Sequence, residues 1–344
     1  ITNRKISFLS RASQFAVTAT ALALKSAHIS ARDLNKEKTG VLIGTTMGEE
    51  RPLNDTVATW VKEGDSKINK QKILFSTANN ITSNIGTYFH LEGVNLIFSN
   101  ACAAGNFALG YGFDLIRSGD LEYAIAGGVD SFSKTAFSGF HRLYSMAPEK
   151  CQPFDKNRKG MMVGEGAGIL ILESLDSALK RGAEIHAEVL GYGLSCDAHH
   201  ITSPNPAGVE KAIRKALKES GLKPEDIDYI NAHGTGTPAN DRTECKAILD
   251  VFKESAGRIP VSSIKSMIGH AMGAASAIET LSCCLALKNN ILPPTINYET
   301  PDPACNIDCV PNKARKMEID LVLKNSFAFG GNNACIVLKK YHNR

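Results

Sequence analysis

One short pattern occurs twice in this chain, around Cys102 and again around His233. Residues 94–101 form a short apolar run that ends in Asn-Ala before Cys102, and residues 228–232 end in Asn-Ala before His233. Such a run, closed by small residues, is typical of a buried strand that leads into a tight turn. A nucleophile and an acid/base group at equivalent places in two halves predict a duplicated α/β fold with its active site on the pseudo-twofold axis.

Cys102 has the local sequence of a reactive cysteine. The apolar, helix-compatible segment 103–117 follows it, so the thiol is expected between a buried strand and the N-terminus of a buried helix. Unpaired amides and the helix dipole favour the thiolate there. A lone buried cysteine is more often structural, but the paired pattern favours a nucleophile. The other eight cysteines are expected to be small buried residues in a reducing cytosol, since their spacing suits neither a disulfide framework nor a zinc site.

The chain divides into two similar halves, residues 1–175 and 176–344, with no linker or low-complexity tract between them. Apolar runs and amphipathic periodicity predict the elements of each half. Strands are expected at 40–44, 94–100, 123–128, 168–173, 186–192, 228–231, 259–263 and 334–338, and helices at 8–27, 103–117, 174–181 and 208–220. The boundary near residue 175 is therefore expected to be a packed seam.

Composition argues against several classes of protein. Hydrophobic residues make up 43% of the 344 residues and charged residues 22%, as in an ordinary soluble globular protein. The net charge of +4 is too small and dispersed to indicate nucleic acid binding, although it suits an acidic partner. No apolar run is long enough to span a bilayer and no signal peptide opens the chain, so a cytoplasmic location is expected.

Six segments concentrate small, polar and titratable residues. They are Asn-Ala-Cys at 100–102, Gln-Pro-Phe-Asp at 152–155, Gly-Glu-Gly-Ala-Gly at 164–168, His-Gly-Thr-Gly-Thr-Pro at 233–238, Lys-Ser-Met-Ile-Gly-His at 265–270 and Asn-Ser-Phe-Ala-Phe-Gly-Gly-Asn at 325–332. In this order and spacing they resemble the β-ketoacyl-acyl carrier protein synthases of the elongating type, from residue 1 to the C-terminus. One motif alone would be weak evidence, whereas the ordered set is strong.

The resemblance implies a thiolase-like α/β fold, in which two βαβ-rich halves stack as an α-β-α-β-α layered sandwich. Family members begin with a strand and a helix more than this chain, which starts at Ile1. The N-terminal strand of the first half is therefore expected to be missing, either because the sequence is trimmed or because one sheet lacks an edge element. The implied activity is that of an acyltransferase, which condenses a cysteine-bound acyl chain with malonyl-acyl carrier protein.

The resemblance also assigns the central catalytic roles. Cys102 takes the acyl chain, and the backbone N–H groups of Cys102 and Phe329 form the oxyanion hole. His233 and His270 donate N–H bonds to the enolate that forms when the malonyl group loses carbon dioxide. Initiating condensing enzymes use His and Asn instead, so His270 favours elongation from a malonyl donor.

Lys265 and Glu244 are implied to support the histidines. By resemblance, Lys265 tunes the site electrostatically and holds His270 through a network with Glu244. Taken alone, a lysine near a strand end is usually solvated, and a lone histidine is more often structural. The combination with Cys102 and the Gly-Thr-Gly-Thr turn favours catalysis.

The resemblance places a further group of residues around the substrate. Thr235 and Thr237 bind the pantetheine arm, although threonine in a glycine-rich turn could equally be a local cap. Phe329 is a gate between the acyl pocket and the entrance, with Phe140 as its partner; core packing is the alternative for both. Residues 197–204, which carry two adjacent histidines, are expected to line the entrance without direct catalysis.

The implied partner is an acyl carrier protein, which brings its own phosphopantetheine, so neither a cofactor nor a metal is expected. A homodimer is expected through the edge strand 94–100, with a heterodimer that contains a ketosynthase-like chain-length factor as the alternative. Met47 is expected to limit the acyl length. Glu49 and Glu50 are expected to face solvent, and the alternative is a polar end of the acyl pocket that a partner subunit completes. Neither nucleic acid nor a membrane is an expected partner. The residues expected to dock the carrier are Arg4, Lys5, Arg11 and Arg142.

Three positions bear on the subtype. Gly236 is more like polyketide synthases than housekeeping fatty-acid enzymes. Ala328 and Ser276 stand where the family commonly has glycine, and Ala328 is expected to restrict a loop that must move. We therefore expect a discrete type II ketosynthase in a specialised polyketide or polyene pathway, with fatty acid elongation as the alternative.

Three other classes compete with this interpretation. A cysteine acyl hydrolase would also use Cys and His, but it would gain nothing from His270 or Lys265. A non-catalytic chain-length partner subunit shares the fold but replaces the nucleophile, so Cys102 argues against it. A degradative thiolase would lack the His-Gly-Thr-Gly-Thr and Lys-to-His patterns.

Overall fold

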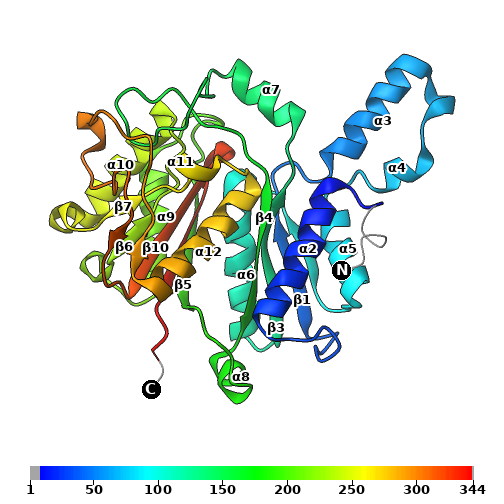
Figure 1. Ribbon diagram of the computed structural model, residues 1–344, viewed down its shortest axis with the longest axis horizontal. Coiled ribbons are helices and arrows are strands. Elements are labelled where there is room, and N and C mark those ends of the chain that lie inside the picture. Colours follow the sequence, from blue (N-terminus) through cyan, green and yellow to red (C-terminus); the bar gives the residue numbers. More distant parts are fainter. Residues whose placement is uncertain (1–7, 343–344) are drawn as a thin grey trace.

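The computed structural model describes residues 8–342, which contain two mixed β-sheets (Figure 1). The strands of the first sheet are β1 Thr39–Gly44, β2 Asn95–Phe98, β3 Tyr123–Asp130 and β4 Gly166–Glu173. Those of the second are β5 Glu188–Cys196, β6 Tyr229–Asn231, β7 Val261–Ser262, β10 Leu321–Ala328 and β11 Asn332–Lys339, and a separate pair joins β8 Ile291–Leu292 to β9 Arg315–Lys316. The strand orders are β2-β1-β3-β4 and β5-β11-β10-β6-β7.

Helices cover both faces of each sheet. They are α2 Arg11–Ser26, α3 Glu50–Glu63, α4 Lys70–Leu74, α5 Asn80–Phe89, α6 Ala104–Arg117, α7 Lys134–Arg142, α8 Leu175–Lys180, α9 Pro206–Glu219, α10 Pro238–Phe252, α11 Lys265–Ile268 and α12 Gly273–Asn289. Helices α2 and α5 pack on the outer face of the first sheet, α6 and α12 lie between the sheets, and α9 and α10 cover the second sheet (Figure 1). The layers therefore alternate as α-β-α-β-α, as expected.

Apolar clusters fill the interfaces between these layers. Strand β1 is buried along its whole length because helices cover both faces of its sheet. Ile81 and Ile85, one helical turn apart on α5, pack against the first sheet. Leu287 of α12 belongs to the cluster between the sheets, and Ile213 of α9 belongs to the cluster on the second sheet.

The two sheets repeat one topology, but the two patterns that suggested the repeat are not equivalent within it. Strand β1 is parallel to β2 and β3, and β3 is antiparallel to β4; likewise β6 is parallel to β7 and β10, and β10 is antiparallel to β11. Cys102 follows the edge strand β2, whereas His233 follows β6, the counterpart of β1. The predicted equivalence is therefore wrong. The counterpart of the Cys102 turn follows β7 and leads to Lys265.

The edge of the first sheet differs from that of the second. Within residues 8–342 no strand pairs with the outer side of β4, the place that β5 takes in the second sheet. The sequence analysis located the other strands of both sheets but missed β10, which begins four residues before the motif at 325–332. In the described part of the chain, none of the helices has the length and apolar character needed to cross a membrane.

Candidate active site

A cavity of about 310 Å³ opens beside Cys102. It is lined by seven of the nine residues that the sequence analysis named for the site, and these are Cys102, Phe140, His233, Thr235, Thr237, His270 and Phe329. Lys265 and Glu244 lie behind this wall, fully buried. Residues 200–204 also line the cavity, which agrees with the expected entrance segment. The fold thus brings together residues from both sheets around one thiol.

Cys102 lies in the short 3-10 turn η2 (Ala101–Ala103), directly before α6. Ala101 has a φ of 49°, in the left-handed region that non-glycine residues rarely adopt, so the turn that presents the thiol is strained. Burial raises the pKa of Cys102 to about 12, against the opposing effect of the Lys265 ammonium. The expected effect of the amides and the helix dipole, which favours the thiolate, is therefore outweighed by burial, which favours the protonated thiol.

The two histidines both line the cavity, and their rings pack edge to face. Their ring centroids are 5.4 Å apart and the ring planes meet at 84°. The Nδ1 of His270 lies 3.1 Å from the backbone N–H of Met272, and the Nδ1 of His233 lies 3.4 Å from the Nζ of Lys265. Because both neighbours can only donate, each Nδ1 must accept, and each neutral ring carries its proton on Nε2. Both imidazoles therefore carry their N–H donor on Nε2, and both line the cavity.

Both imidazoles are neutral at physiological pH. Burial lowers the pKa of His233 and of His270 well below 6.5, and the charges of Lys265 and Lys324 lower both further. Neutral N–H donors in a dry site suit an oxygen that gains negative charge during a reaction.

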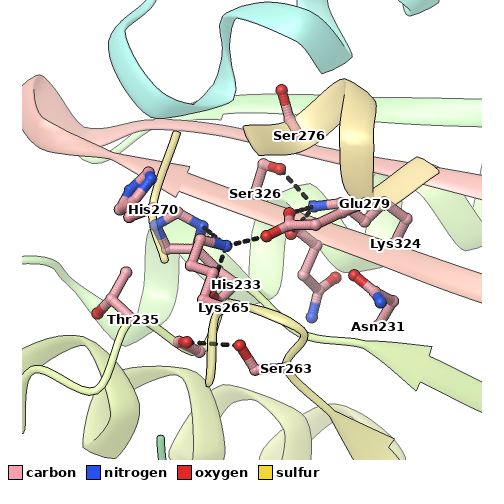
Figure 2. Close-up of polar contacts among 12 residues, drawn as sticks. Asn231, His233, Thr235, Ser263, Lys265, His270, Ser276, Glu279, Lys324 and Ser326 are labelled. Atoms are coloured by element: carbon pink, nitrogen blue, oxygen red, sulfur yellow. Dashed lines mark hydrogen bonds and ion pairs between the residues drawn. The ribbon is translucent and has the colours of Figure 1, made fainter. Parts of the chain in front are cut away.

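Lys265 is held differently from the prediction. Its Nζ donates to the backbone carbonyl of His233 at 2.6 Å and to the carboxylate of Glu279, an ion pair with both partners fully buried (Figure 2). Glu244 does not join this network through Lys265. It accepts the backbone N–H groups of His233 and Gly234, each at 2.8 Å. Lys265 therefore positions His233 rather than His270, and Glu244 fixes the turn that carries His233.

The threonines and phenylalanines lie where a ligand would pass. Thr235 and Thr237 share a 2.8 Å hydrogen bond between their hydroxyl groups at the cavity wall. The rings of Phe329 and Phe140 lie 5.4 Å apart, and Phe329 is 37% exposed. Ala328 has a φ of −134° in extended backbone, so its side chain adds no strain in this conformation.

The structure explains why Ser276 stands where glycine is common and why the charged residue Glu49 is buried. Ser276 accepts the backbone N–H of Asn106 at 3.2 Å, so it ties α12 to α6 where glycine could not. Glu49, expected to face solvent, is instead buried, and its carboxylate accepts the N–H of Ser13 at 3.0 Å and the Ser13 hydroxyl. That prediction is wrong because α2 covers the loop. Met47 does not line the cavity.

The sequence analysis missed three buried charged residues beside the site. Asp130, at the end of β3, accepts the backbone N–H groups of Thr46, Met47 and Gly273 at 2.7–2.9 Å and so joins the first sheet to the start of α12. Glu279 and Lys324 lie on α12 and β10. Their side chains become neighbours only after folding, so no local pattern marked them. Within residues 8–342, no three His, Cys, Asp or Glu side chains gather in a way that could hold a metal ion.

Comparisons with known proteins agree with this arrangement. The family models of the Beta-ketoacyl synthase N-terminal and C-terminal domains match residues 1–178 and 186–299. A 3-oxoacyl-[acyl-carrier-protein] synthase 2 of Synechocystis sp. is 42% identical over 342 residues, 97% of this chain and 82% of that protein. The solved ishigamide ketosynthase/chain length factor matches with a TM-score of 0.94 and 43% identity, over 97% of this chain and 83% of its own. A type II PKS ketosynthase, bound to a hexaketide and in complex with its acyl-carrier protein, matches with a TM-score of 0.93 and 32% identity, over 96% and 85%.

Proposed function

Because this chain belongs to the β-ketoacyl synthase family and has the thiolase-like fold, we propose that it condenses a Cys102-bound acyl chain with malonyl-acyl carrier protein. It is an acyltransferase-class condensing enzyme. The observation that carries the proposal is the opening of Cys102, His233 and His270 into one cavity, with both imidazoles in the same tautomer.

In the first step the Cys102 sulfur attacks the thioester carbonyl of the acyl carrier. The S–C bond to the carrier breaks, and the proton of the Cys102 thiol ends on the departing carrier thiol. Burial raises the pKa of Cys102, so we propose that this proton leaves the thiol during the exchange. The backbone N–H groups of Cys102 and Phe329 are the proposed donors to the oxyanion.

In the second step malonyl-acyl carrier protein enters and loses carbon dioxide. The electron pair of the broken C–C bond forms a thioester enolate, whose oxygen receives the Nε2–H bonds of His233 and His270. The enolate carbon then attacks the acyl carbonyl, the bond to the Cys102 sulfur breaks, and one proton restores the thiol. Thr235 and Thr237 are proposed to hold the pantetheine arm of either carrier.

The carrier supplies the phosphopantetheine, so we propose that the enzyme uses no resident cofactor or metal. An acyl carrier protein is the partner, as it is for the type II PKS ketosynthase similar to this chain. The edge position of β2 supports a homodimer, with a chain-length-factor heterodimer as the alternative. We propose a cytoplasmic location.

The 43% identity to the ishigamide ketosynthase/chain length factor favours a polyketide-type pathway, and the 42% identity to a 3-oxoacyl-[acyl-carrier-protein] synthase 2 keeps fatty acid elongation as the second candidate.

Intact-mass analysis tests the proposal directly. Incubation with acyl carriers of graded length should add one acyl group to the peptide that contains Cys102, and malonyl carrier should then yield a lengthened β-ketoacyl thioester. Cys102→Ala should abolish the adduct, whereas Cys284→Ala, on the far part of α12, should keep it. Release of free acid would favour a cysteine hydrolase, and an adduct on another cysteine would contradict the assignment of Cys102.

A further inference from the structure

Two lysines share one carboxylate in the interior of this protein. Lys265, Glu279 and Lys324 are each no more than 1% exposed. Lys265 pairs with Oε1 of Glu279, and the Nζ of Lys324 forms a second ion pair with Oε2 at 2.7 Å (Figure 2). We call these three residues the buried charge triad. With both lysines charged, the triad has a net charge of +1.

The Nζ of Lys324 has three polar contacts in the protein interior. Besides its ion pair with Glu279, its Nζ donates to the hydroxyl of Ser326 at 2.6 Å and to the backbone carbonyl of Asn325. The ion pair and these two hydrogen bonds give the ammonium group three oxygen partners. Burial lowers the pKa of Lys324, whereas the Glu279 carboxylate raises it, so its oxygen partners favour the charged form against the cost of burial.

The groups around the two imidazoles make the lysines the dominant nearby charges. The titratable and charged groups come from every element packed around the rings: Cys102 of η2, Asp130 of β3, Glu244 of α10, Lys265 of α11, Glu279 of α12 and Lys324 of β10. Glu244 accepts the backbone N–H groups of His233 and Gly234 and the side-chain amide of Asn325. Asp130 accepts bonds from the loop after β1 and from the start of α12.

We propose that Lys324 is a positioning residue of the condensation, which holds Glu279 against Lys265 and adds the positive charge that keeps His233 and His270 neutral and favours the enolate. This inference rests on the proposed function, because it concerns the same two imidazoles. Without Lys324 the triad would be neutral, and Glu279 would keep one buried oxygen without a positive partner. Both changes raise the affinity of the imidazoles for protons.

The test compares two variants that change the triad charge in opposite directions. Lys324→Met preserves the length of the side chain and lowers the charge to zero, so the acidic limb of malonyl-carrier decarboxylation should move to higher pH by roughly one unit. Glu279→Gln raises the charge to +2, so the same limb should move to lower pH. The control is Lys288→Met. Lys288 lies on α12, as Glu279 does, but it is exposed and pairs with Glu184, so its loss should leave the pH profile unchanged.

Histidine titration gives a readout that does not depend on activity. In protein labelled with [13Cε1]histidine, the signals of His233 and His270, assigned with their Asn variants, should titrate at higher pH in Lys324→Met than in the wild type. If the wild type does not decarboxylate malonyl carrier, the proposed function is wrong. The change in histidine titration between Lys324→Met and the wild type would still test the role of the buried charge triad. If Lys324→Met lowers stability but moves neither the profile nor the titrations, Lys324 is only structural. If Lys324→Met does not fold, the Glu279→Gln variant decides: an unchanged pH profile of decarboxylation in Glu279→Gln would overturn the inference.

Discussion

At the scale of single residues, the reaction depends on two imidazoles fixed as Nε2–H donors. Met272 and Lys265 impose this tautomer on His270 and His233 through Nδ1. The site therefore separates two tasks. Cys102 exchanges thioesters, and the histidines stabilise the charge that appears only after decarboxylation.

Replacing one histidine should separate the two half-reactions. His270→Ala removes one donor to the enolate oxygen, so malonyl-carrier decarboxylation should fall by about a hundredfold or more, while acylation of Cys102 should fall much less. Radiolabelled carbon dioxide release and intact mass measure the two steps. His199→Ala, outside the cavity wall, serves as the control. Normal decarboxylation by both His270→Ala and His233→Ala would exclude the two-imidazole mechanism.

The lowered histidine pKa values also predict how stability depends on pH. The folded protein binds protons at His233 and His270 only well below pH 6.5, whereas the unfolded chain binds them near 6.5. This contribution to the free energy of unfolding is therefore present above pH 6.5 and is lost as the pH falls below it, by up to about 1.4 kcal/mol per pH unit for each histidine.

Substituting one of these histidines should weaken that dependence. Between pH 7.5 and 5.5, thermal unfolding of His270→Asn should show a shallower loss of stability than the wild type. The buried Asp130, whose pKa burial raises to about 6, acts in the opposite direction but is common to both proteins. An identical slope in both proteins would mean that His270 titrates normally in the folded state.

At the scale of elements, the turn after β10 has strict backbone requirements. Gly330 and Gly331 have φ values of 78° and 72°. A Cβ on Gly331 would lie 2.6 Å from the Cβ of Asp197 and 2.9 Å from its backbone nitrogen. The loop that carries Phe329 is therefore held against the segment after β5.

Alanine substitutions should distinguish Gly331, which is in close contact with Asp197, from a glycine that has no close neighbour. Gly331→Ala should destabilise the protein by several kcal/mol or displace the loop, since it adds a clash to the cost of the left-handed backbone. Gly119→Ala has a similar φ of 79° but meets nothing within 4 Å, so it should cost only about 1–2 kcal/mol. Denaturant unfolding and Cys102 acylation rates measure both effects. Equal losses would show that the Asp197 contact relaxes freely.

Helix α7 places a basic residue beside the entrance. Phe140 lines the cavity, and Arg142, two residues later on the same helix, is exposed. Arg11 is less available, because it pairs with Glu165 and lies 4.8 Å from the ring of Phe15. The other proposed docking residues, Arg4 and Lys5, lie outside the described residues.

Charge reversal at this helix should weaken carrier binding specifically. Arg142→Glu should raise the KM for acyl-carrier protein several-fold, with an effect that shrinks at high salt, and should spare a small pantetheine thioester. Lys180→Glu, on α8 at the opposite end of the molecule from α7 (Figure 1), should leave both substrates unaffected. Equal loss with both substrates in Arg142→Glu would indicate damage to the site instead of the docking surface.

At the scale of the whole molecule, the sheet that presents Cys102 has an open edge. Strand β2 lies at this edge, and Val94 and Leu96 are each 38% exposed. An edge strand with exposed apolar side chains can pair with a second copy across a twofold axis. The turn that carries Cys102 directly follows this strand, so the association state should affect the site.

A charge on this edge should therefore disrupt the dimer. Leu96→Asp should halve the molar mass measured by light scattering and reduce condensation activity. Leu179→Asp, at an exposed leucine of α8, should change neither. A wild-type protein that is monomeric at micromolar concentration would contradict the proposed interface.

The sequence alone determined the class of fold and most of the cavity wall. Apolar runs closed by small residues marked the strands that end at Cys102, His233 and Lys265, because strand ends and tight turns are encoded locally. The family motifs then named the residues that line the cavity. Strand β10 was missed because Lys324 interrupts its apolar run, and α10 because polar and charged residues fill its first half; α5 was also missed.

Only the tertiary structure decided how these residues act. It showed that Cys102 and His233 follow non-equivalent strands, that burial raises the pKa of the Cys102 thiol, and that Lys265 pairs with Glu279 rather than Glu244. Ionisation and pairing depend on which groups meet in a region of low dielectric. Glu279 and Lys324 are 45 residues apart in sequence and meet only when α12 packs against β10, so local sequence could not indicate their contact.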